Sequence, residues 1–539
     1  MEKTKWWKKA LVYQIYPLSF MDSNEDGIGD IRGIISQLDY LKNLGVDVIW
    51  LSPIYNSPME DNGYDISDYY NINPIFGSMD DFKELLSQVH KRKMRIIMDL
   101  VVNHTSNEHI WFKEALKDKN SKYRDYYIWD KNPNDIVSVF SGSAWEYDQQ
   151  SGEYYFHLFS KGQPDLNWNN ESLRYEIYKM INFWLDLGVD GFRLDVIDLI
   201  GKDVEKMMLA DGPFLEKHLL EMYDNCFRGR DIMTVGETPG ISIERAKELT
   251  TYPKNYLDMV FQFSHVSLDE EKGKDKWHYK KIDFSELKKV FAKSQHVFKH
   301  EGWNSLFWSN HDQVRAVSRY GSEKYWNKSA KMLMVILYGM KGTPYVYQGE
   351  ELGMTGIKLD KIDEYKDVET INMYRDFISR GYGHDWIMEA IYKKGRDNSR
   401  TPIQWDDSIN GGFSKVKPWI KVNENFKSIN AKEQLRDVNS VYNFVKRFFK
   451  LRKENEVFTF GDCNFLNLDE TWLFEYKRVF NNQEIIVVAN FSDENQYLET
   501  NKYKKYNIMI SNYNKLDNDS IVPPYWVAVY ERGLTNGDN

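Results

Sequence analysis

The sequence predicts an α/β fold: a (β/α)8 TIM barrel with a subdomain inserted after its third strand and a C-terminal antiparallel β-sandwich domain. Three observations support this expectation. Short apolar runs alternate with longer amphipathic segments from Leu11 onward, which is typical of βα units. That rhythm stops after residue 103 and resumes near residue 172. From about Phe458 the pattern changes to short alternating strands with Asn- and Asp-rich turns.

Eight apolar runs have the length and composition of buried parallel strands. We expect these strands at residues 12–16, 46–54, 95–102, 191–196, 231–237, 258–263, 305–310 and 344–348. Helical patterns lie between them, for example at residues 31–44, 80–92 and 172–187. Eight such units close into a barrel, whose functional groups are expected at the C-terminal ends of the strands.

The changes of pattern divide the chain into three expected domains. Residues 1–103 and 172–457 form the barrel, called domain A. Residues 104–171 form an inserted subdomain, domain B, because a structureless loop of that length is improbable in a compact protein. Residues 458–539 form a small all-β domain C.

Charge and composition exclude several kinds of partner. Lys plus Arg number 71 and Asp plus Glu number 81, which gives a net charge of −10. This balance argues against binding to nucleic acid or to an anionic membrane. Aromatic residues make up 15% of the chain, which suits stacking on a flat, weakly polar ligand such as a sugar, although core packing also uses such rings.

Cysteine content and hydrophobic runs favour a cytoplasmic protein. The two cysteines, Cys226 and Cys463, are too far apart in sequence to indicate a disulfide framework or a metal-binding cluster. Residues 10–15 are too short and too interrupted for the core of a signal peptide, and no run of ~18 apolar residues occurs. We therefore expect a cytoplasmic monomer without a membrane partner.

One expected strand, at residues 191–196, carries a cation and a carboxylate. Arg193 and Asp195 lie two residues apart, so their side chains should share one face of the strand. A guanidinium lowers the pKa of an adjacent carboxyl by about 1 to 3 units. We therefore expect Asp195 to be ionised and able to act as a nucleophile. For an isolated pair of this kind, a structural ion pair is the alternative.

Polar residues also follow the neighbouring strands, and together they form a larger set. They are Asp99, Asn103, His104, Arg193, Asp195, Glu237, Asn310, His311 and Asp312. Glycoside hydrolysis needs two carboxylates that flank the scissile bond. The charges of Asp195 and Asp312 should keep Glu237 protonated, as an acid requires. His104 and His311 would bind sugar hydroxyls, although either one alone is more often a packed or capping histidine.

Four segments resemble signature regions of the α-amylase family of glycoside hydrolases. They are residues 99–104 (DLVVNH), 191–195 (GFRLD), 236–238 (GET) and 310–312 (NHD), and the likeness extends over nearly the whole chain. The resemblance implies a retaining double displacement. In it, Asp195 is the nucleophile, Glu237 is the acid/base, and Asp312 stabilises the transition state by holding ring hydroxyls. Arg193, His104 and His311 are then substrate-binding residues.

Further segments resemble the branch of oligo-1,6-glucosidases and dextran glucosidases, which are glucan 1,6-α-glucosidases. These segments are residues 6–17, 61–65, 163–168 and 396–402. By this resemblance, Asp61, Tyr64 and Arg400 close the pocket around the terminal non-reducing glucose. The implied substrates are isomaltose, panose and isomalto-oligosaccharides or dextran fragments. Thr238 departs from the Met of many oligo-1,6-glucosidases and leaves the preferred chain length open.

The residue after the nucleophile, Val196, goes with α-1,6 cleavage in the resembled branch. An α-1,4-glucosidase would favour Thr or a small residue there. A sucrose isomerase would carry Phe-Asp-Thr at the nucleophile, and a trehalose-6-phosphate hydrolase usually has Ala where this chain has Pro164. A non-enzymatic carbohydrate-binding or transporter-associated barrel is disfavoured because all three carboxylates are present.

An acidic loop near the N-terminus predicts a metal site. Its candidate ligands are Asp22, Asn24, Asp26, Ile28 through its backbone carbonyl, and Asp30. They follow the first nine positions of a calcium-binding loop, with Gly27 at the sharp turn, but Gly33 stands where an EF-hand has Glu. A solvated acidic turn is the alternative. Because the resembled branch has one structural Ca²⁺ in this loop, we expect one ion without a catalytic role.

Overall fold

The computed structural model describes residues 5–516 and 520–533. Its centre is a barrel of parallel strands in the order β11-β10-β9-β5-β2-β1-β13-β12. The strands are β1 (Val12–Ile15), β2 (Val48–Leu51), β5 (Arg95–Leu100), β9 (Gly191–Leu194), β10 (Met233–Glu237), β11 (Met259–Phe261), β12 (Ser305–Leu306) and β13 (Thr343–Tyr347). A parallel bridge between Val260 and Asn304 joins the two outer strands. The predicted barrel is therefore confirmed, and it is closed.

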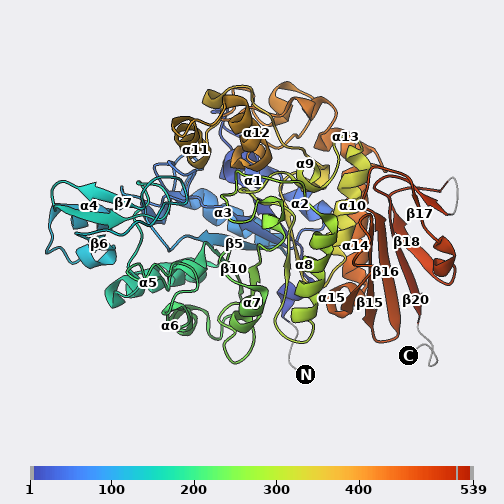
Figure 1. Cartoon of the computed structure of the whole chain (residues 1–539), viewed down its shortest axis with the longest axis horizontal. Helices are drawn as coiled ribbons and strands as arrows, with labels where there is room; N and C mark the ends of the chain where they lie inside the picture. Colours follow the sequence, from blue (N-terminus) through green and yellow to red (C-terminus); the bar gives the residue numbers. More distant parts are fainter. Residues whose placement is uncertain (1–4, 517–519, 534–539) are drawn as a thin grey trace.

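Helices surround the barrel, as Figure 1 shows. They are α1 (Ile31–Ser36), α2 (Leu38–Leu44), α3 (Met79–Lys91), α5 (Glu171–Leu187), α6 (Leu215–Met222), α7 (Ile243–Thr250), α8 (Phe284–Val297), α9 (Ala316–Tyr320), α10 (Trp326–Tyr338), α13 (Ala431–Arg436), α14 (Val441–Glu454) and α15 (Glu456–Phe460). Local sequence sets their ends. Ser78 and Asp81 form a capping box at the start of α3, and Gly188 ends α5 in a left-handed conformation with φ 111°.

Several strands are shorter at their C-terminal ends than the sequence predicts. The strand expected at residues 191–196 ends at Leu194, because Val196 has a left-handed conformation with φ 34°. The strand expected at residues 305–310 is only two residues long. The helix expected at residues 31–44 is divided at Gln37 into α1 and α2. The apolar runs in the sequence extend past the ends of the strands because the loops at the C-terminal end of the barrel are also buried.

The inserted segment contains α4 (Ile110–Lys117) and a small antiparallel sheet. The sheet has the order β6-β8-β7, with β6 at Trp129–Asp130, β7 at Trp145–Asp148 and β8 at Glu153–Phe156. A hydrophobic cluster joins it to the loop after β9, since Trp145 and Phe156 belong to the same buried group as Leu199 and Val204. The insert therefore packs beside the loop that follows Asp195. In Figure 1 it lies at the left.

Two further short strands, β3 (Tyr55–Asn56) and β4 (Asp68–Ile72), pair beside the barrel. The long connection after β13 contains α11 (Val368–Ser379) and α12 (His384–Lys394). These two helices have a core of their own that includes Phe377 and Ile387. Figure 1 shows them at the top of the molecule. The same connection carries Asp367, Arg396 and Arg400, which reach the active site described below.

The C-terminal part is an antiparallel sheet in the order β14-β15-β16-β20-β18, with a two-stranded ribbon of β17 and β19. The strands are β14 (Asp462–Leu466), β15 (Leu473–Phe480), β16 (Gln483–Asn490), β17 (Gln496–Tyr497), β18 (Asn507–Ser511), β19 (Ile521–Val522) and β20 (Val527–Gly533). The sheet lies at the right in Figure 1, beside α10 and α14. The exact domain boundaries expected from the sequence stay predictions. None of the helices in residues 5–516 and 520–533 has the length and apolar character needed to cross a membrane.

Candidate active site

Arg193 is the centre of the carboxylate cluster at the C-terminal ends of β5, β9 and β10. Its Nη1 lies 2.6 Å from Asp99 Oδ1 and 2.7 Å from Asp195 Oδ1. Its Nη2 lies 2.6 Å from Glu237 Oε2. Arg193 and Asp195 therefore share one face, as expected from their spacing. The strand register explains the other two contacts, because Arg193 pairs directly with Asp99 on β5 and with Val235 on β10.

The turn after Asp195 holds this residue beside Glu237. Val196 has φ 34°, a conformation that is strained for a β-branched residue. In this conformation its backbone N–H donates a 3.1 Å hydrogen bond to Glu237 Oε2. Backbone strain of this kind is found mainly where geometry serves function. The turn therefore connects the main chain next to Asp195 directly to the carboxylate of Glu237.

The electrostatics of this cluster correct one expectation. Burial raises the pKa of Asp195, and the carboxylates of Glu237 and Asp99 add to the rise, while Arg193 opposes it. Burial likewise raises the pKa of Asp99 to about 6. Arg193 lowers the pKa of Asp195 as expected, but the expected net lowering is wrong, because burial and two neighbouring carboxyl groups outweigh one shared guanidinium. Protonation in such a cluster belongs to the interacting groups together and not to one residue.

Asp312 lies in a positively charged environment on the other side of the site. Its Oδ1 lies 2.7 Å from Arg400 Nη2 and 3.5 Å from Arg396 Nη1. Its Oδ2 lies 3.2 Å from His311 Nε2. Burial would raise the pKa of Asp312, but contact with His311 and the positive charges of Arg396 and Arg400 outweigh this effect and hold that pKa well below its usual range. Asp312 is therefore ionised near neutral pH.

The two candidate histidines are buried and neutral near pH 7. Burial lowers the pKa of His104 to about 4 and the pKa of His311 to about 3. Nε2 of His104 lies 3.1 Å from the carbonyl oxygen of Tyr64. Nδ1 of His311 lies 2.8 Å from the side-chain amide of Gln14, whereas its Nε2 lies 3.2 Å from Asp312 and makes no hydrogen bond with any residue that the structure describes. Nε2 of the neutral His311 is therefore suited to bind a hydroxyl group. Both nitrogens of His104 already have polar contacts.

An ion-pair network closes the far end of the site. Asp61 Oδ1 lies 3.0 Å from Arg396 Nη2, and Asp367 Oδ1 lies 2.5 Å from the same nitrogen. Burial raises the pKa of Asp61 to about 6, with Arg396 and Arg400 opposing the rise. Tyr64 donates a 3.0 Å hydrogen bond to Asp99, and its ring stacks on His311 with centroids 5.0 Å apart. All the candidate catalytic and substrate-binding residues from the sequence thus lie around one site.

Three residues of this site were not among the sequence candidates. They are Gln163, Asp367 and Arg396. Asp99 was in the set at the strand ends without an assigned role, and the structure places it as a partner of Arg193. The amide of Gln163 donates to Asp61 at 3.0 Å and lies 3.2 Å from His104 Nε2. Gln163 and Arg396 stand in segments that carried the family resemblance, so a signal existed for both. Asp367 lies in the loop before α11, where the sequence shows no motif.

The predicted calcium loop places its ligands in hydrogen bonds with its own backbone. Asp22 accepts hydrogen bonds from the amides of Glu25 and Gly27 at 2.8 and 2.9 Å, and Asp30 caps α1 through Gly33. Within residues 5–516 and 520–533, no three His, Cys, Asp or Glu side chains are arranged to hold a metal ion. An ion here would therefore depend also on the side-chain oxygen of Asn24 and the carbonyl of Ile28.

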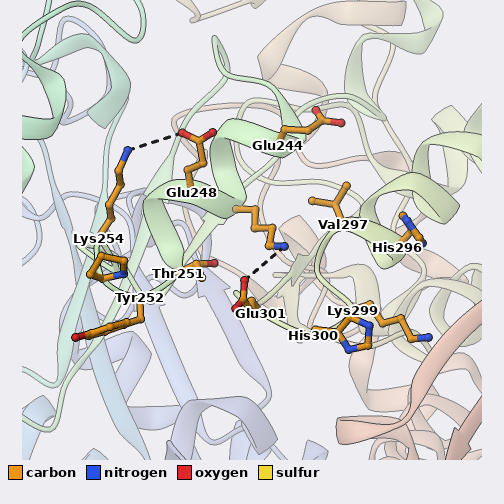
Figure 2. A pocket seen from close by; sticks show the side chains of 12 residues that line it. Glu244, Glu248, Thr251, Tyr252, Lys254, His296, Val297, Lys299, His300 and Glu301 are labelled. Carbon is orange, nitrogen blue, oxygen red and sulfur yellow. Dashed lines mark ion pairs between the residues drawn. The ribbon is translucent and has the colours of Figure 1, made fainter.

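A separate pocket of about 640 Å³ lies at the opposite end of the barrel. Figure 2 shows residues from α7, from the end of α8 and from the segments that follow these helices lining it, among them Tyr252 and His300. These segments lead into the N-terminal ends of β11 and β12, whereas Glu237 ends β10 on the other face. This pocket is therefore not part of the catalytic cluster.

Comparison with known proteins agrees with this geometry. A sequence profile described as alpha amylase, catalytic domain, matches residues 14–461. The chain is 49% identical to an oligo-1,6-glucosidase of Bacillus cereus, over 98% of this chain and 100% of that protein. It is 49% identical to a glucan 1,6-alpha-glucosidase of Streptococcus pneumoniae, over 94% and 95% of the two chains. A solved structure of a mutant Bacillus licheniformis trehalose-6-phosphate hydrolase has a TM-score of 0.93 at 46% identity, over 98% of this chain and 100% of that one. This chain belongs to the α-amylase family.

Proposed function

We propose that the protein is a retaining exo-glycosidase that hydrolyses terminal non-reducing α-1,6-linked glucose. The substrates are isomaltose, panose and isomalto-oligosaccharides or dextran fragments. One observation carries the proposal: Asp195 and Glu237 bind two nitrogens of the same guanidinium, at 2.7 and 2.6 Å. This arrangement holds the two carboxyl groups close together, as a covalent double displacement requires. The relatives named oligo-1,6-glucosidase and glucan 1,6-alpha-glucosidase support the substrate class.

In the first step, the Asp195 carboxylate attacks the anomeric carbon while Glu237 gives its proton to the departing glycosidic oxygen. The products are a glucosyl ester on Asp195 and a free leaving sugar. In the second step, the Glu237 carboxylate takes a proton from water, and the water oxygen attacks the anomeric carbon. The bond to Asp195 breaks, which frees α-glucose and restores the Asp195 carboxylate. Asp312, held ionised by Arg400, His311 and Arg396, accepts hydrogen bonds from ring hydroxyls as the sugar distorts.

Exo-action follows from the closed end of the site. Arg396 pairs with Asp61 and Asp367, and Arg400 pairs with Asp312. By the family resemblance, Asp61, Tyr64 and Arg400 surround the terminal glucose, so these buried ion pairs would block a chain that continues beyond it. The same pairs argue against a phosphate-binding role, because both guanidinium groups already bind carboxylates. For this reason trehalose 6-phosphate is the second candidate substrate and not the first.

The experiment is a product assay with isomaltose, panose, maltose, sucrose, trehalose and trehalose 6-phosphate. We expect rapid release of glucose from isomaltose and panose. Faster cleavage of trehalose 6-phosphate would contradict the assignment, and so would conversion of sucrose to an isomer. Glu237→Gln should remove nearly all turnover of isomaltose while leaving the fold intact.

We also propose one structural Ca²⁺ in the loop of residues 22–30. The spacing of Asp22, Asn24, Asp26 and Asp30 supports the ion, although the loop hydrogen bonds described above need no metal. An ion that binds only the folded protein adds stability in proportion to the logarithm of its free concentration. A chelator should lower the melting temperature without changing kcat at temperatures where the protein stays folded. An unchanged melting temperature would count against the ion.

Location and assembly are part of the proposal. We propose a cytoplasmic monomer, since Cys226 and Cys463 are both buried and free, which fits a reducing compartment. Cell fractionation tests the compartment, and light scattering behind a sizing column tests the mass of the assembly.

A further inference from the structure

A buried carboxyl group, Asp198, lies between the two loops that carry the catalytic pair. It belongs to the 3-10 turn Ile197–Leu199 that follows Asp195, and it is 0% exposed. Its Oδ2 accepts a 2.8 Å hydrogen bond from the amide of Gly240, three residues after Glu237. Its Oδ1 is buried and makes no hydrogen bond with any residue in the described part of the chain. An ionisable group held in this way needs an explanation beyond packing.

The contact between the two loops is close and specific. A Cβ on Gly240 would lie 2.3 Å from Cβ of Ala210 and 3.0 Å from Oδ2 of Asp198. The backbone carbonyl of Asp198 accepts a 3.0 Å hydrogen bond from the amide of Asp211. In the residue before Glu237, a Cβ added to Gly236 would lie 2.9 Å from Ile197 Cγ2. Asp198 therefore connects the chain after the nucleophile to the chain after the acid.

The charge of Asp198 can change near neutral pH. Burial raises its pKa to about 7, the amide of Gly240 opposes the rise, and the charge of Glu237 adds to it. Asp211 also faces Asp198, but both of its oxygens lie 3.0 Å from Arg245 Nε, so its charge is balanced locally. The other charged groups that face Glu237 are Asp99, Arg193 and Asp195. Arg193 forms ion pairs with Asp99, Asp195 and Glu237. Among the described residues, no cation forms an ion pair with Asp198.

We propose that Asp198 is a positioning residue for Glu237: it fixes the loop after Glu237, and its negative charge keeps the proton on Glu237 until that proton passes to the departing sugar. The proposal rests on the proposed function, because it assigns Asp198 a task in the step that Glu237 performs. Below neutral pH, Asp198 is protonated and exerts no charge. Above it, the ionised carboxylate opposes the ionisation of Glu237 and extends activity to higher pH.

The test is the pH dependence of kcat/KM on isomaltose in Asp198→Asn. The amide oxygen can still accept the hydrogen bond from Gly240, so the variant removes the charge and keeps the contact. We expect an unchanged acid limb and an alkaline limb that moves to lower pH by at least about 0.5 unit. The matched control is Asp203→Asn. It removes a carboxylate from the same loop, where Asp203 pairs with Lys206 at 2.7 Å, and it should leave the alkaline limb in place.

A fall in kcat at every pH with both limbs unmoved would overturn the proposal, since it would show a purely structural role. An equal shift in the control would also overturn it, because the effect would then be a general response to net charge. Asp198→Ser provides a second neutral variant with a smaller side chain, and it should move the alkaline limb in the same direction. Hydrolysis of isomaltose by the wild type and its loss in Glu237→Gln test the proposed function separately.

Discussion

At the scale of single residues, the electrostatics of the site depend on one cation that contacts several carboxylates. Arg193 alone contacts Asp99, Asp195 and Glu237, all less than 7% exposed. Isolated buried carboxylates would be neutral, and a fully paired set would be ionised. Sharing one guanidinium places Asp99 and Asp195 between these limits, because burial raises their pKa values and Arg193 opposes the rise. Carboxyl groups around one cation can therefore differ in protonation, as the proposed acid and nucleophile require.

Retention of configuration is the first prediction at this scale. Carboxyl groups about 5 to 5.5 Å apart leave no room for a water molecule between the second carboxylate and the sugar. NMR of the first product from isomaltose should therefore show α-glucose. Initial β-glucose would rule out the covalent intermediate. Asp195→Asn should remove nearly all turnover, with an unfolding temperature close to that of the wild type.

Linkage choice is the second prediction, and it concerns Val196. An α-1,6 link adds an exocyclic carbon and a free torsion, so the leaving sugar can turn away from a branched apolar side chain. An α-1,4 link holds that sugar close and favours a smaller or hydrogen-bonding neighbour. Val196→Thr or Val196→Ala should raise the ratio of kcat/KM on maltose to kcat/KM on isomaltose. The expected change corresponds to at least ~1 kcal/mol in relative transition-state energy. An unchanged ratio would move the origin of specificity to groups such as Thr238.

At the scale of elements, the sequence predicts strands and helices well but not where they end. Periodicity places β5, β9 and β10 correctly, since buried parallel strands are continuous apolar runs. It overextends β9 because Val196 remains apolar after the chain has turned, and nothing in its side chain signals φ 34°. Site residues in the long connection after β13 are harder to predict from the sequence than the ends of strands. Asp367 reaches Arg396 only through the fold of the segment around α11 and α12.

The connection between α8 and the C-terminal sheet gives a prediction at this scale. Lys288 is 1% exposed, and its Nζ donates to the carbonyl oxygens of Asn467 at 2.9 Å and Leu473 at 3.0 Å, and also to that of Glu470. Lys288→Met leaves these carbonyls without a donor and should lower the free energy of unfolding by at least about 2 kcal/mol. Thermal unfolding measures the loss. Exposed Lys289→Met is the control, and equal effects of the two changes would contradict the role of Lys288.

At the scale of the whole molecule, buried ionisable groups make stability depend on pH in opposite directions. Acids with raised pKa values, such as Asp61 at about 6 and Glu350 at about 7, favour the folded state as pH falls. Buried histidines with lowered pKa values, such as His104 and His265, favour the unfolded state as pH falls. The change of the unfolding free energy with pH is the sum of the contributions from both sets. A single-residue variant isolates one contribution, because the rest cancels in the difference.

His265 allows such a test away from the catalytic cluster. Burial lowers its pKa to about 3, and its Nε2 lies 3.0 Å from the carbonyl oxygen of Phe307. In the unfolded chain its pKa returns to about 6.5. Between these values the unfolded chain binds a proton that the folded protein does not, so stability is complete above pH ~6.5 and falls by about 1.4 kcal/mol per unit as pH decreases toward 3.

His265→Gln keeps an amide donor for Phe307 and removes this titration. Its free energy of unfolding should therefore fall less steeply than that of the wild type between pH 6.5 and 4, whatever its stability at pH 7. Denaturant titrations at several pH values measure the two slopes. Exposed His300→Gln is the control, and it should reproduce the wild-type slope. Parallel curves for His265→Gln and the wild type would show that His265 takes up its proton in the folded protein after all.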